Sequence, residues 1–512
     1  MCRFPLIASL LVVVSCTPTE KQSLWDSELS NDSGLDSEPG VADTGGGNSG
    51  DSGVGDTGNQ GGGGQGGGGQ GGGGQGGGNT PNPSPCQNLS RGQCWVRTQP
   101  MMISGLVVGM ENPPASVVQQ FFDQFGANTA QFWMDGLPAQ VQGWRAANHP
   151  DFRWISWVQS DASSVSTGTT LGGVGSSSPG RVGFQVGDEP RTMEELIGLE
   201  VGIQAVRATD PDALVIMNFG NGETESIRDE MLQYFANFMD GDIMSYDQYG
   251  PSYSSYRHLE RTRQVAVEHG IPYWRYLNSF AEAGKSDEFP TETDMRWDAL
   301  KGLVYGYTGH TWFLYQTNPA HNLETALFDS TGEWSANQVQ AWYTAADLNR
   351  ELAVYGRTIT QLTSTDVRYI PEVSLYAPEG TTNWGPGAGG DPYITSISPQ
   401  NLSFYEFQDV LVGFFEDDLG EIYVMLQNPT HESASWPIMV EDEAEFRIEF
   451  DFRGAPSTLD TTQIKTLNVQ TETVVPHPLQ PLGGQSAALD ITLAAGDAIL
   501  FKYATGAPFA SQ

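Results

Sequence analysis

Eight short apolar runs with the character of β-strands follow one another after Gln99, most of them separated by stretches in which apolar residues recur at helical spacing. The runs cover residues 103–110, 128–135, 152–159, 182–188, 213–219, 242–249, 272–280 and 309–316. Alternating strands and helices are typical of a parallel sheet, because each parallel strand needs a long crossover before the next. Eight such units in about 250 residues predict an α/β fold, a closed (β/α)8 or TIM barrel. We place this barrel at residues 101–360.

The segments between the runs support helical crossovers on the outside of the barrel. Apolar residues such as Val118 and Phe122 repeat at helical spacing, and a helix beginning near residue 255 is expected to end at Gly270. One connection differs, because residues 161–180 are rich in Ser, Gly and Thr without helical periodicity. A long segment of this kind is usually functional or disordered, and we expect it over the carboxyl end of the barrel.

The pattern changes after the barrel. Apolar strands at 410–415 and 422–427, joined by a turn, and further strands at 446–452 and 498–503 follow without helices between them. Many short strands connected by turns are typical of two packed antiparallel sheets. We therefore predict an antiparallel β-sandwich domain over residues 361–512.

The chain begins with a weakly basic residue, Arg3, and an apolar run at residues 6–14 that is too short to span a membrane. The sequence VVSC at residues 13–16 resembles the lipobox of bacterial lipoproteins. The resemblance implies that residues 1–15 are a signal peptide and that Cys16 carries a lipid. It also implies an extracytoplasmic, membrane-anchored lipoprotein on the cell surface or the periplasmic face. The alternative is an ordinary secretory signal in which this cysteine has no role.

Residues 16–85 consist mostly of Gly, Ser, Asp, Asn and Gln and include the GGGGQ repeats of residues 61–75. A segment of this composition buries too little apolar surface to fold and behaves as a flexible coil. Roughly 70 residues of such coil have an r.m.s. span of about 45 Å. We therefore predict a tether that connects a lipid anchor in the bilayer with the folded domain.

Four cysteines are present, at positions 2, 16, 86 and 94. Since Cys2 leaves with the signal peptide and Cys16 is modified, Cys86 and Cys94 remain, in a lead-in at residues 86–100. Outside the cytoplasm these two are expected to form a disulfide that closes a small loop ahead of the barrel. Two thiols without neighbouring histidines make no metal site, and the seven histidines show no ligand spacing. We expect no metal and no cofactor.

The formal net charge of −38 constrains the partner. It argues against nucleic acid and other anionic polymers, because the chain would repel them. A neutral oligo- or polysaccharide is compatible with such a surface.

Polar and aromatic side chains gather at the carboxyl ends of the predicted strands, where (β/α)8 barrels carry their active sites. Aromatic faces can cover the C–H side of a sugar ring while carboxylates and amides take its hydroxyl groups. The residues expected to bind substrate are Trp133, Asp135, Trp157, Asp188, Asn218, Tyr246, Tyr249, Asn278, Trp312 and Tyr315. Packing in the core is an equal alternative for each tryptophan among them.

Residues 183–191, GFQVGDEPR, end the fourth run with two carboxylates, Asp188 and Glu189. Glycosidic cleavage needs two carboxyl groups, one protonated at the leaving oxygen and one acting as nucleophile or base. Beside a like charge and aromatic groups, Glu189 is expected to have a raised pKa, as a proton donor requires. The alternative is that Glu189 only caps the following helix or pairs with Arg191.

The Asp-Glu-Pro at 188–190, the Tyr-Asp-x-Tyr at 246–249 and Trp312 on the eighth run resemble a group of barrel glycoside hydrolases. In that group the acid/base glutamate stands in an Asn-Glu-Pro, as in the family 42 β-galactosidase relatives. The resemblance covers about residues 105–355, and a β-sandwich is a common companion of such barrels. It implies that Glu189 is the general acid/base. Asp188 replaces the usual Asn, which affects how the sugar's 2-hydroxyl is held.

The seventh run departs from that family, because residues 273–280 read YWRYLNSF and contain no acid where a nucleophilic glutamate is usual. Glu282, two residues further on, is the best substitute, and Asp247 is the runner-up. A nucleophilic Glu282 predicts retention of anomeric configuration, whereas Asp247 as the partner acid predicts inversion. The fourth and seventh strand ends face each other across a barrel of eight, which favours Glu282 and retention.

The sequence thus predicts a surface-tethered glycoside hydrolase that cleaves a neutral glycan with two carboxylates. The alternative is a carbohydrate-binding lipoprotein on a degenerate barrel, which the missing acid of the seventh run favours. No motif in the sequence supports a third possibility, a barrel lyase or esterase.

Overall fold

The computed structural model describes residues 86–107, 112–132, 137–158, 180–220, 225–249, 254–282, 288–316, 324–328, 335–371, 377–400, 409–432 and 443–511. At 137–139, 254, 282 and 324–325 only the main chain is described. All described residues belong to one compact unit, Thr80–Gln512. The predicted signal peptide, Cys16 and the tether lie outside the described residues, as does the Ser/Gly/Thr-rich segment apart from Gly180.

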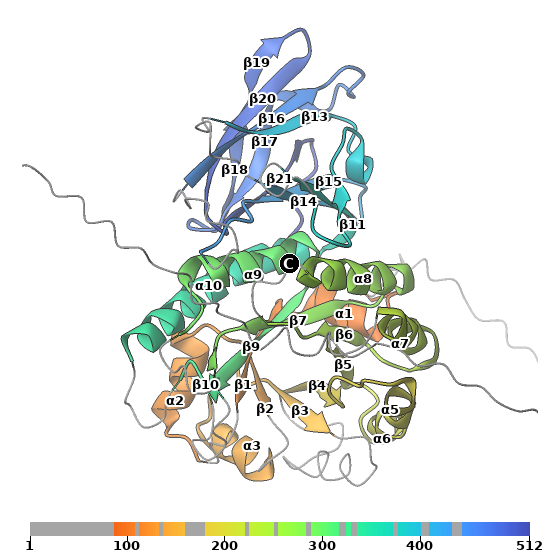
Figure 1. The fold of residues 1–512 in the computed structure, drawn as a ribbon, viewed down its shortest axis with the longest axis vertical. Helices are drawn as coiled ribbons and strands as arrows, with labels where there is room; N and C mark the ends of the chain where they lie inside the picture. Colours follow the sequence, from red (N-terminus) through yellow and green to blue (C-terminus); the bar gives the residue numbers. More distant parts are fainter. Residues whose placement is uncertain are drawn as a thin grey trace, which may run out of the picture. The chain divides into compact units, whose positions relative to one another are not determined.

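Eight parallel strands form a closed barrel in the order β1-β2-β3-β4-β5-β6-β7-β9 (Figure 1), and β9 pairs back onto β1. The strands are β1 Met102–Val107, β2 Thr129–Phe132, β3 Trp154–Val158, β4 Arg181–Val186, β5 Leu214–Phe219, β6 Ile243–Tyr246, β7 Tyr273–Asn278 and β9 Gly309–Gln316. Each lies within or within one residue of a predicted run. The prediction of a closed (β/α)8 barrel is therefore confirmed.

Helices surround the barrel on its outside, as Figure 1 shows. They are α2 Ala115–Gln119 with the π-helix η2 Gln120–Gln124, α3 Leu137–Ala146, α5 Met193–Gly198, α6 Glu200–Thr209, α7 Glu225–Phe238, α8 Ser254–His269, α9 Glu292–Val304 and α10 Ala336–Ile359. Helix α8 ends directly before Gly270, as predicted. Among the described helices, none combines the length and the apolar character needed to cross a bilayer.

Side chains alternate along each strand between the barrel axis and the helices. On β5, Val215 and Met217 belong to the core under the helices, whereas Leu214 and Ile216 belong to a separate apolar cluster inside the barrel. That inner cluster fills the amino-terminal half of the barrel. Its members are Met102, Ile155, Val182, Leu214, Ile216, Ile243 and Trp274. The amino half of the interior is thus closed by ordinary apolar packing, and polar groups lie in the carboxyl half.

Helix α1 (Arg91–Thr98), which the sequence did not reveal, closes the amino-terminal end of the barrel. Ser90 and Gln93 form a capping box that starts this helix. Its Trp95 packs edge-on against Trp274 of the inner cluster, with ring centroids 5.5 Å apart. Gly92 is needed there, because a Cβ at this position would lie 2.2 Å from the carbonyl oxygen of Asp242.

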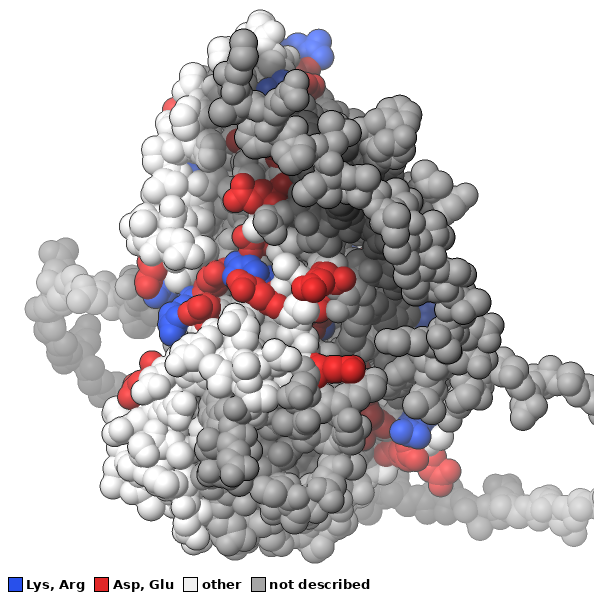
Figure 2. Space-filling view, turned by 60° about the vertical axis from the view of Figure 1, so that its left-hand side comes forward, with Lys and Arg blue, Asp and Glu red and all other residues white. Residues whose placement is uncertain are grey.

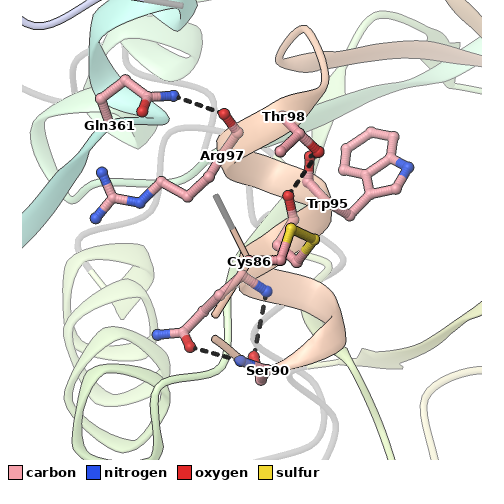
Figure 3. The surroundings of a disulfide bond; sticks show 8 residues. Cys86, Ser90, Trp95, Arg97, Thr98 and Gln361 are labelled. Atoms are coloured by element: carbon pink, nitrogen blue, oxygen red, sulfur yellow. Dashed lines mark hydrogen bonds between the residues drawn. A yellow bond between two sulfur atoms is a disulfide. The ribbon is translucent and has the colours of Figure 1, made fainter. Parts of the chain in front are cut away.

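Cys86 and Cys94 are joined by a disulfide, as predicted, with Cα atoms 4.9 Å apart. Figure 3 shows the bond on the side of α1, where the Thr98 hydroxyl donates to the Cys94 carbonyl at 2.7 Å. The disulfide therefore fastens the start of the described chain to the helix that closes the barrel.

The C-terminal domain consists of two mainly antiparallel sheets, in the orders β12-β11-β14-β15-β21-β17-β18 and β13-β16-β20-β19. Its strands are β11 Leu362–Ile370, β12 Thr382–Asn383, β13 Ile394–Gln400, β14 Val410–Asp417, β15 Ile422–Gln427, β16 Glu443–Asp451, β17 Asp460–Asn468, β18 Thr473–Pro478, β19 Gln480–Gly483, β20 Ser486–Ala494 and β21 Ala498–Ala504. The two sheets share one apolar core, which contains Phe446 of β16 and Phe501 of β21. This confirms the predicted β-rich domain after the barrel.

Polar contacts join the sandwich to helices α9 and α10 of the barrel. The guanidinium of Arg296 on α9 binds both carboxylate oxygens of Glu351 on α10, at 3.1 and 2.8 Å, and Asp497 before β21 at 2.5 Å. The Tyr355 hydroxyl donates to the Ala498 carbonyl at 2.7 Å. Arg296 thus connects three elements from two domains through one largely buried cation.

We predict that Arg296→Met lowers the free energy of unfolding by about 3 kcal/mol, because it leaves two poorly solvated carboxylates without their cation. Arg350→Met on α10 is the control, since Arg350 pairs with Asp347 at the surface, with side-chain exposures of 62% and 64%. The free energy of unfolding of Arg350→Met should be lower than that of the parent by less than about 1 kcal/mol. Urea denaturation measures both, and equal losses would contradict the role of Arg296.

Candidate active site

The chain leaves β4 through a tight turn that carries two acids over the barrel mouth. Gly187 has a φ of +74° and donates its N–H to the Val158 carbonyl at 2.9 Å. Glu189 has a φ of +40°, a conformation that costs energy in a residue with a side chain, and its N–H donates to the Asn218 carbonyl at 3.0 Å. Strain of this kind is frequent at functional sites, where surrounding contacts hold it.

The carboxyl groups of Asp188, Glu189 and Asp247 meet at this mouth. Asn218, at the carboxyl end of β5, is hydrogen-bonded to two of them. Its amide nitrogen donates to Asp188 Oδ1 at 2.9 Å and to Asp247 Oδ2 at 3.1 Å. The Glu189 carboxyl extends over Gly220, where a Cβ would lie 2.5 Å from Glu189 Oε1. The sequence predicted all three acids and Asn218 for the site, and the structure brings these four together.

Burial and mutual repulsion act on two of the three acids. Asp188 is open to solvent on one side. Burial by the protein atoms on its other side, together with the charge of Glu189, raises the pKa of Asp188 to about 7. The hydrogen bonds that Asn218 and Gln185 donate to Asp188 act in the opposite direction and lower this pKa. Asp247 is only 8% exposed, and burial followed by the charge of Glu189 raises the pKa of Asp247 well above its usual range. Both effects act in the same direction and favour the protonated forms of Asp188 and Asp247.

Aromatic rings line the mouth beside Asp247. Tyr249 stacks on Phe313 with ring centroids 4.9 Å apart, and Phe280 meets both rings edge-on at 5.4 Å. All three are only partly buried. The Tyr249 hydroxyl lies close to the Asp247 carboxyl, without the geometry of an ordinary hydrogen bond. Phe280 and Phe313 were missed in the sequence, although Phe313 directly follows the predicted Trp312 and Phe280 lies two residues after the predicted Asn278.

Three residues predicted to bind substrate lie on the outer face of the barrel instead. The Trp312 indole is fully buried and donates to Asn349 of α10 at 2.7 Å. Tyr315 is fully buried against Phe121, with centroids 4.7 Å apart. The Tyr246 hydroxyl bonds to His258 of α8 at 2.7 Å. None of these rings has a face free for a sugar, so we remove Trp312, Tyr315 and Tyr246 from the candidate site.

The remaining predicted residues have mixed positions. Trp157 shares the inner face of β3 with Ile155 and is 4% exposed, whereas Asn278 is half-buried at the end of β7. The main chain of Glu282 lies on β8 (Ala281–Glu282), which pairs antiparallel with β10 (Glu324–Thr325), but its side chain is outside the described residues. Trp133 and Asp135 lie outside the described residues entirely.

Four polar side chains inside the barrel lie directly beneath the acids, and the sequence had not marked them as functional. They are Gln131 of β2, Gln185 of β4, Tyr276 of β7 and Thr311 of β9, which are hydrogen-bonded to one another and to Asp188. A signal was present, because Gln131 stands between Ala130 and Phe132, and Gln185 between Phe184 and Val186. Within the described part of the chain, no group of three or more His, Cys, Asp or Glu residues is arranged to hold a metal ion.

Comparison with known proteins gives only structural matches, since no protein-family model and no curated protein matches the chain significantly. A glycoside hydrolase family 5 structure from Bacteroides vulgatus covers 80% of this chain and 90% of its own, at 10% identity and a TM-score of 0.49. A GH30 endoxylanase from Clostridium papyrosolvens covers 80% and 97%, at 9% identity and a TM-score of 0.38. A maltogenic alpha-amylase from Thermotoga neapolitana covers 80% of this chain and 99% of its own, at 11% identity and a TM-score of 0.41. With likenesses this low, the function has to be inferred from the residues of this chain.

We predict that Asp247→Asn changes the pH dependence of stability. A carboxyl whose folded pKa lies above its unfolded value of about 4 stabilises the fold fully below that value and loses this contribution as pH rises. The parent therefore loses stability through Asp247 as pH rises, whereas Asp247→Asn has no carboxyl there and does not. The Tm of the variant relative to the parent should be higher at pH 8 than at pH 5.

The control is Asp451→Asn, because the hydrogen bond from Arg453 lowers the pKa of Asp451, and the contribution of that carboxylate to stability changes only below a pH of about 4. The Tm of Asp451→Asn relative to the parent should therefore be the same at pH 5 and pH 8. Thermal unfolding at both pH values decides. A pH-independent difference for Asp247→Asn would show that its carboxyl is not perturbed in the folded protein.

Proposed function

We propose that this chain is a glycoside hydrolase whose active site is the barrel mouth. The observation that carries the proposal is the grouping of Asp188, Glu189 and Asp247 around Asn218. Cleavage of a glycosidic bond requires a protonated and an ionised carboxyl on opposite sides of the bond. Because the three acids interact, they bind protons as a group.

A neutral glycan is the substrate that fits best. The chain carries 62 acidic and 24 basic residues. Acidic side chains are prominent on the face drawn in Figure 2. This excess disfavours an anionic polymer. The partly buried rings of Tyr249, Phe280 and Phe313 offer apolar contact to the C–H face of a sugar. The side-chain amide oxygen of Asn218, Oδ1, is buried without a partner in the described residues and can accept a sugar hydroxyl.

In the proposed reaction, Glu189 gives its proton to the glycosidic oxygen while the bond from that oxygen to the anomeric carbon breaks. With Glu282 as nucleophile, its carboxylate forms an ester to the anomeric carbon. Glu189 then takes a proton from the water that cleaves this ester, and configuration is retained. With the ionised form of Asp247 as general base, a water gives its proton to Asp247 and attacks the anomeric carbon directly, and configuration is inverted. The resemblance to family 42 enzymes supports Glu189 as acid/base, and the order of strands supports Glu282.

The second candidate function is carbohydrate binding without catalysis. One observation favours it: β7 ends on Asn278, an amide, where the nucleophile of the resembling enzymes would stand. The experiments below separate the two, since a binder retains a glycan without turning it over.

We predict that Glu189→Gln lowers turnover of an unactivated neutral glycan by about 10²-fold or more, the usual size of an acid–base contribution. Aryl glycosides with good leaving groups should lose less, because they need little protonation. Asp123→Asn is the control, since Asp123 lies near the amino-terminal end of the barrel beside His149. Unchanged turnover in Glu189→Gln would refute the assignment, and glycan retardation without turnover in the parent would favour the binder.

The partner acid is tested with Glu282→Ala and Asp247→Ala. Loss of a nucleophile should be rescued by azide, with a glycosyl azide as product. NMR of the first-formed anomer should show retention when Glu282 is the residue that matters, and inversion when Asp247 is. Full activity in both variants would leave the two-carboxylate mechanism without support.

We also propose that the protein is held at a membrane by a lipid on Cys16, on the grounds of the lipobox-like sequence and the composition of residues 16–85. Cys16→Ala should move the protein from the membrane fraction to the soluble fraction, whereas Cys86→Ala should leave its fractionation unchanged. A Cys16→Ala protein that still fractionates with membranes contradicts the anchor.

A further inference from the structure

A layer of four polar side chains crosses the barrel interior just beneath the mouth. Gln131, Gln185, Tyr276 and Thr311 come from four different strands, and their exposures are 3, 1, 2 and 3%. The amino half of the same barrel holds a cluster of seven buried apolar residues, so the interior can also be filled by apolar packing. Buried polar groups cost free energy unless each finds its partners, and a buried network of this kind therefore calls for a function.

The hydrogen bonds of this layer follow one direction. The Thr311 hydroxyl donates to Gln131 Oε1 at 3.2 Å, so the amide nitrogen of Gln131 faces the other way. That nitrogen donates to Gln185 Oε1 at 2.6 Å and to the Tyr276 hydroxyl at 2.5 Å. The Tyr276 hydroxyl in turn donates to Gln185 Oε1 at 2.7 Å. Gln185 Oε1 thus accepts two hydrogen bonds.

Gln185 is therefore held with its amide nitrogen toward the mouth. An amide carries its oxygen and its nitrogen on opposite sides, and the oxygen is already bound by Gln131 and Tyr276. The nitrogen donates to Asp188 Oδ1 at 3.2 Å and lies 3.4 Å from the Gly187 carbonyl. Together with Asn218, it gives Asp188 Oδ1 two N–H donors.

We infer that Gln185 is a positioning residue, oriented by Gln131 and Tyr276, that presents an N–H donor to Asp188 and thereby holds this carboxylate in the group of acids at the barrel mouth. The inference concerns Gln185, a residue near the carboxyl end of β4 that is 1% exposed. It rests on the proposed function only for its effect on turnover, because the hydrogen bonds exist whatever the mouth binds.

The geometry has a consequence for the charge of Asp188. Donors to a carboxylate favour its ionised form, whereas its partial burial and neighbouring negative charges oppose ionisation. The titratable groups that face Asp188 among the described residues are Glu189 on its own turn, Asp247 and Tyr249 beyond β6, and Tyr276 on β7. Loss of the Gln185 donor should therefore shift the balance toward the protonated form of Asp188.

The test is an NMR titration of the Asp188 carboxyl carbon in the full chain without substrate, with the signal assigned by Asp188→Asn. In Gln185→Met, which keeps side-chain volume but donates no hydrogen bond, we expect the midpoint to rise by about 0.5–1 pH unit. Tyr276→Phe removes only the hydroxyl that donates to Gln185, so it should raise the Asp188 midpoint by less. Tyr273→Phe is the matched control, since its buried hydroxyl lies on the outer face of the same strand and donates to the Tyr305 carbonyl at 2.8 Å.

An Asp188 midpoint in Gln185→Met and Tyr276→Phe that equals the midpoint in Tyr273→Phe overturns the inference. If Gln185→Met does not fold, the comparison of Tyr276→Phe with Tyr273→Phe decides alone. A shifted midpoint in a protein that hydrolyses no glycan supports the role of Gln185 and refutes the proposed function. An unshifted Asp188 midpoint in a protein that hydrolyses a glycan refutes the role of Gln185 and supports the proposed function.

Discussion

The pairing of β1 with β9 is the constraint on which the rest of the structure depends. Met102 pairs with Gly309 and Gly105 with Trp312, so the eight strands close into a ring. A closed ring has no free edge, and each strand must divide its residues between an axis and an outer layer of helices. The amino half of the axis is apolar and the carboxyl half is polar, which leaves the carboxyl end as the place where acids and amides can meet.

The fold was largely predictable because its signals are local. Each strand is a short apolar run, and residues such as Gly187, Gly270 and Pro272 interrupt the pattern where elements end. The grouping of Asp188, Asn218 and Asp247 was predictable for a different reason, since the carboxyl ends of parallel strands lie at the same end of a barrel. Neither inference required knowledge of any side-chain contact.

The face on which each side chain lies was less predictable. Buried parallel strands are apolar on both faces, so their sequence shows little alternation, and a shift of one residue moves a side chain to the opposite face. Trp312 and Tyr315 were assigned to the mouth on this uncertain basis and belong to the outer core, whereas Phe313 between them faces inward. Helix α1 escaped notice because its eight residues carry few apolar side chains and its packing partners, such as Trp274, are distant in the sequence.

The gathering of three acids at one mouth is unfavourable, and the surrounding structure limits the cost in identifiable ways. Asn218 places one amide group between Asp188 and Asp247, and the raised pKa values allow protons to replace part of the negative charge. The backbone N–H of Glu189 is bound to β5, which fixes a main-chain conformation that the residue would not choose alone. The stability that such a site requires comes from elsewhere, from the packed core and from cross-domain contacts such as that of Arg296.

The position of α1 has a mechanical consequence. Any tension transmitted along the chain from residues before Cys86 enters the fold at the amino-terminal end of the barrel, because α1 contacts the Gly270 carbonyl and Asp242, which precede β7 and β6. The disulfide carries this tension directly to Cys94, in the middle of α1, so the residues between the two cysteines are shielded from it. The helix is then pulled as a body against Trp274 rather than unwound from its first turn. The acids lie at the opposite end of the barrel from α1, so they are remote from the point at which this tension enters the fold.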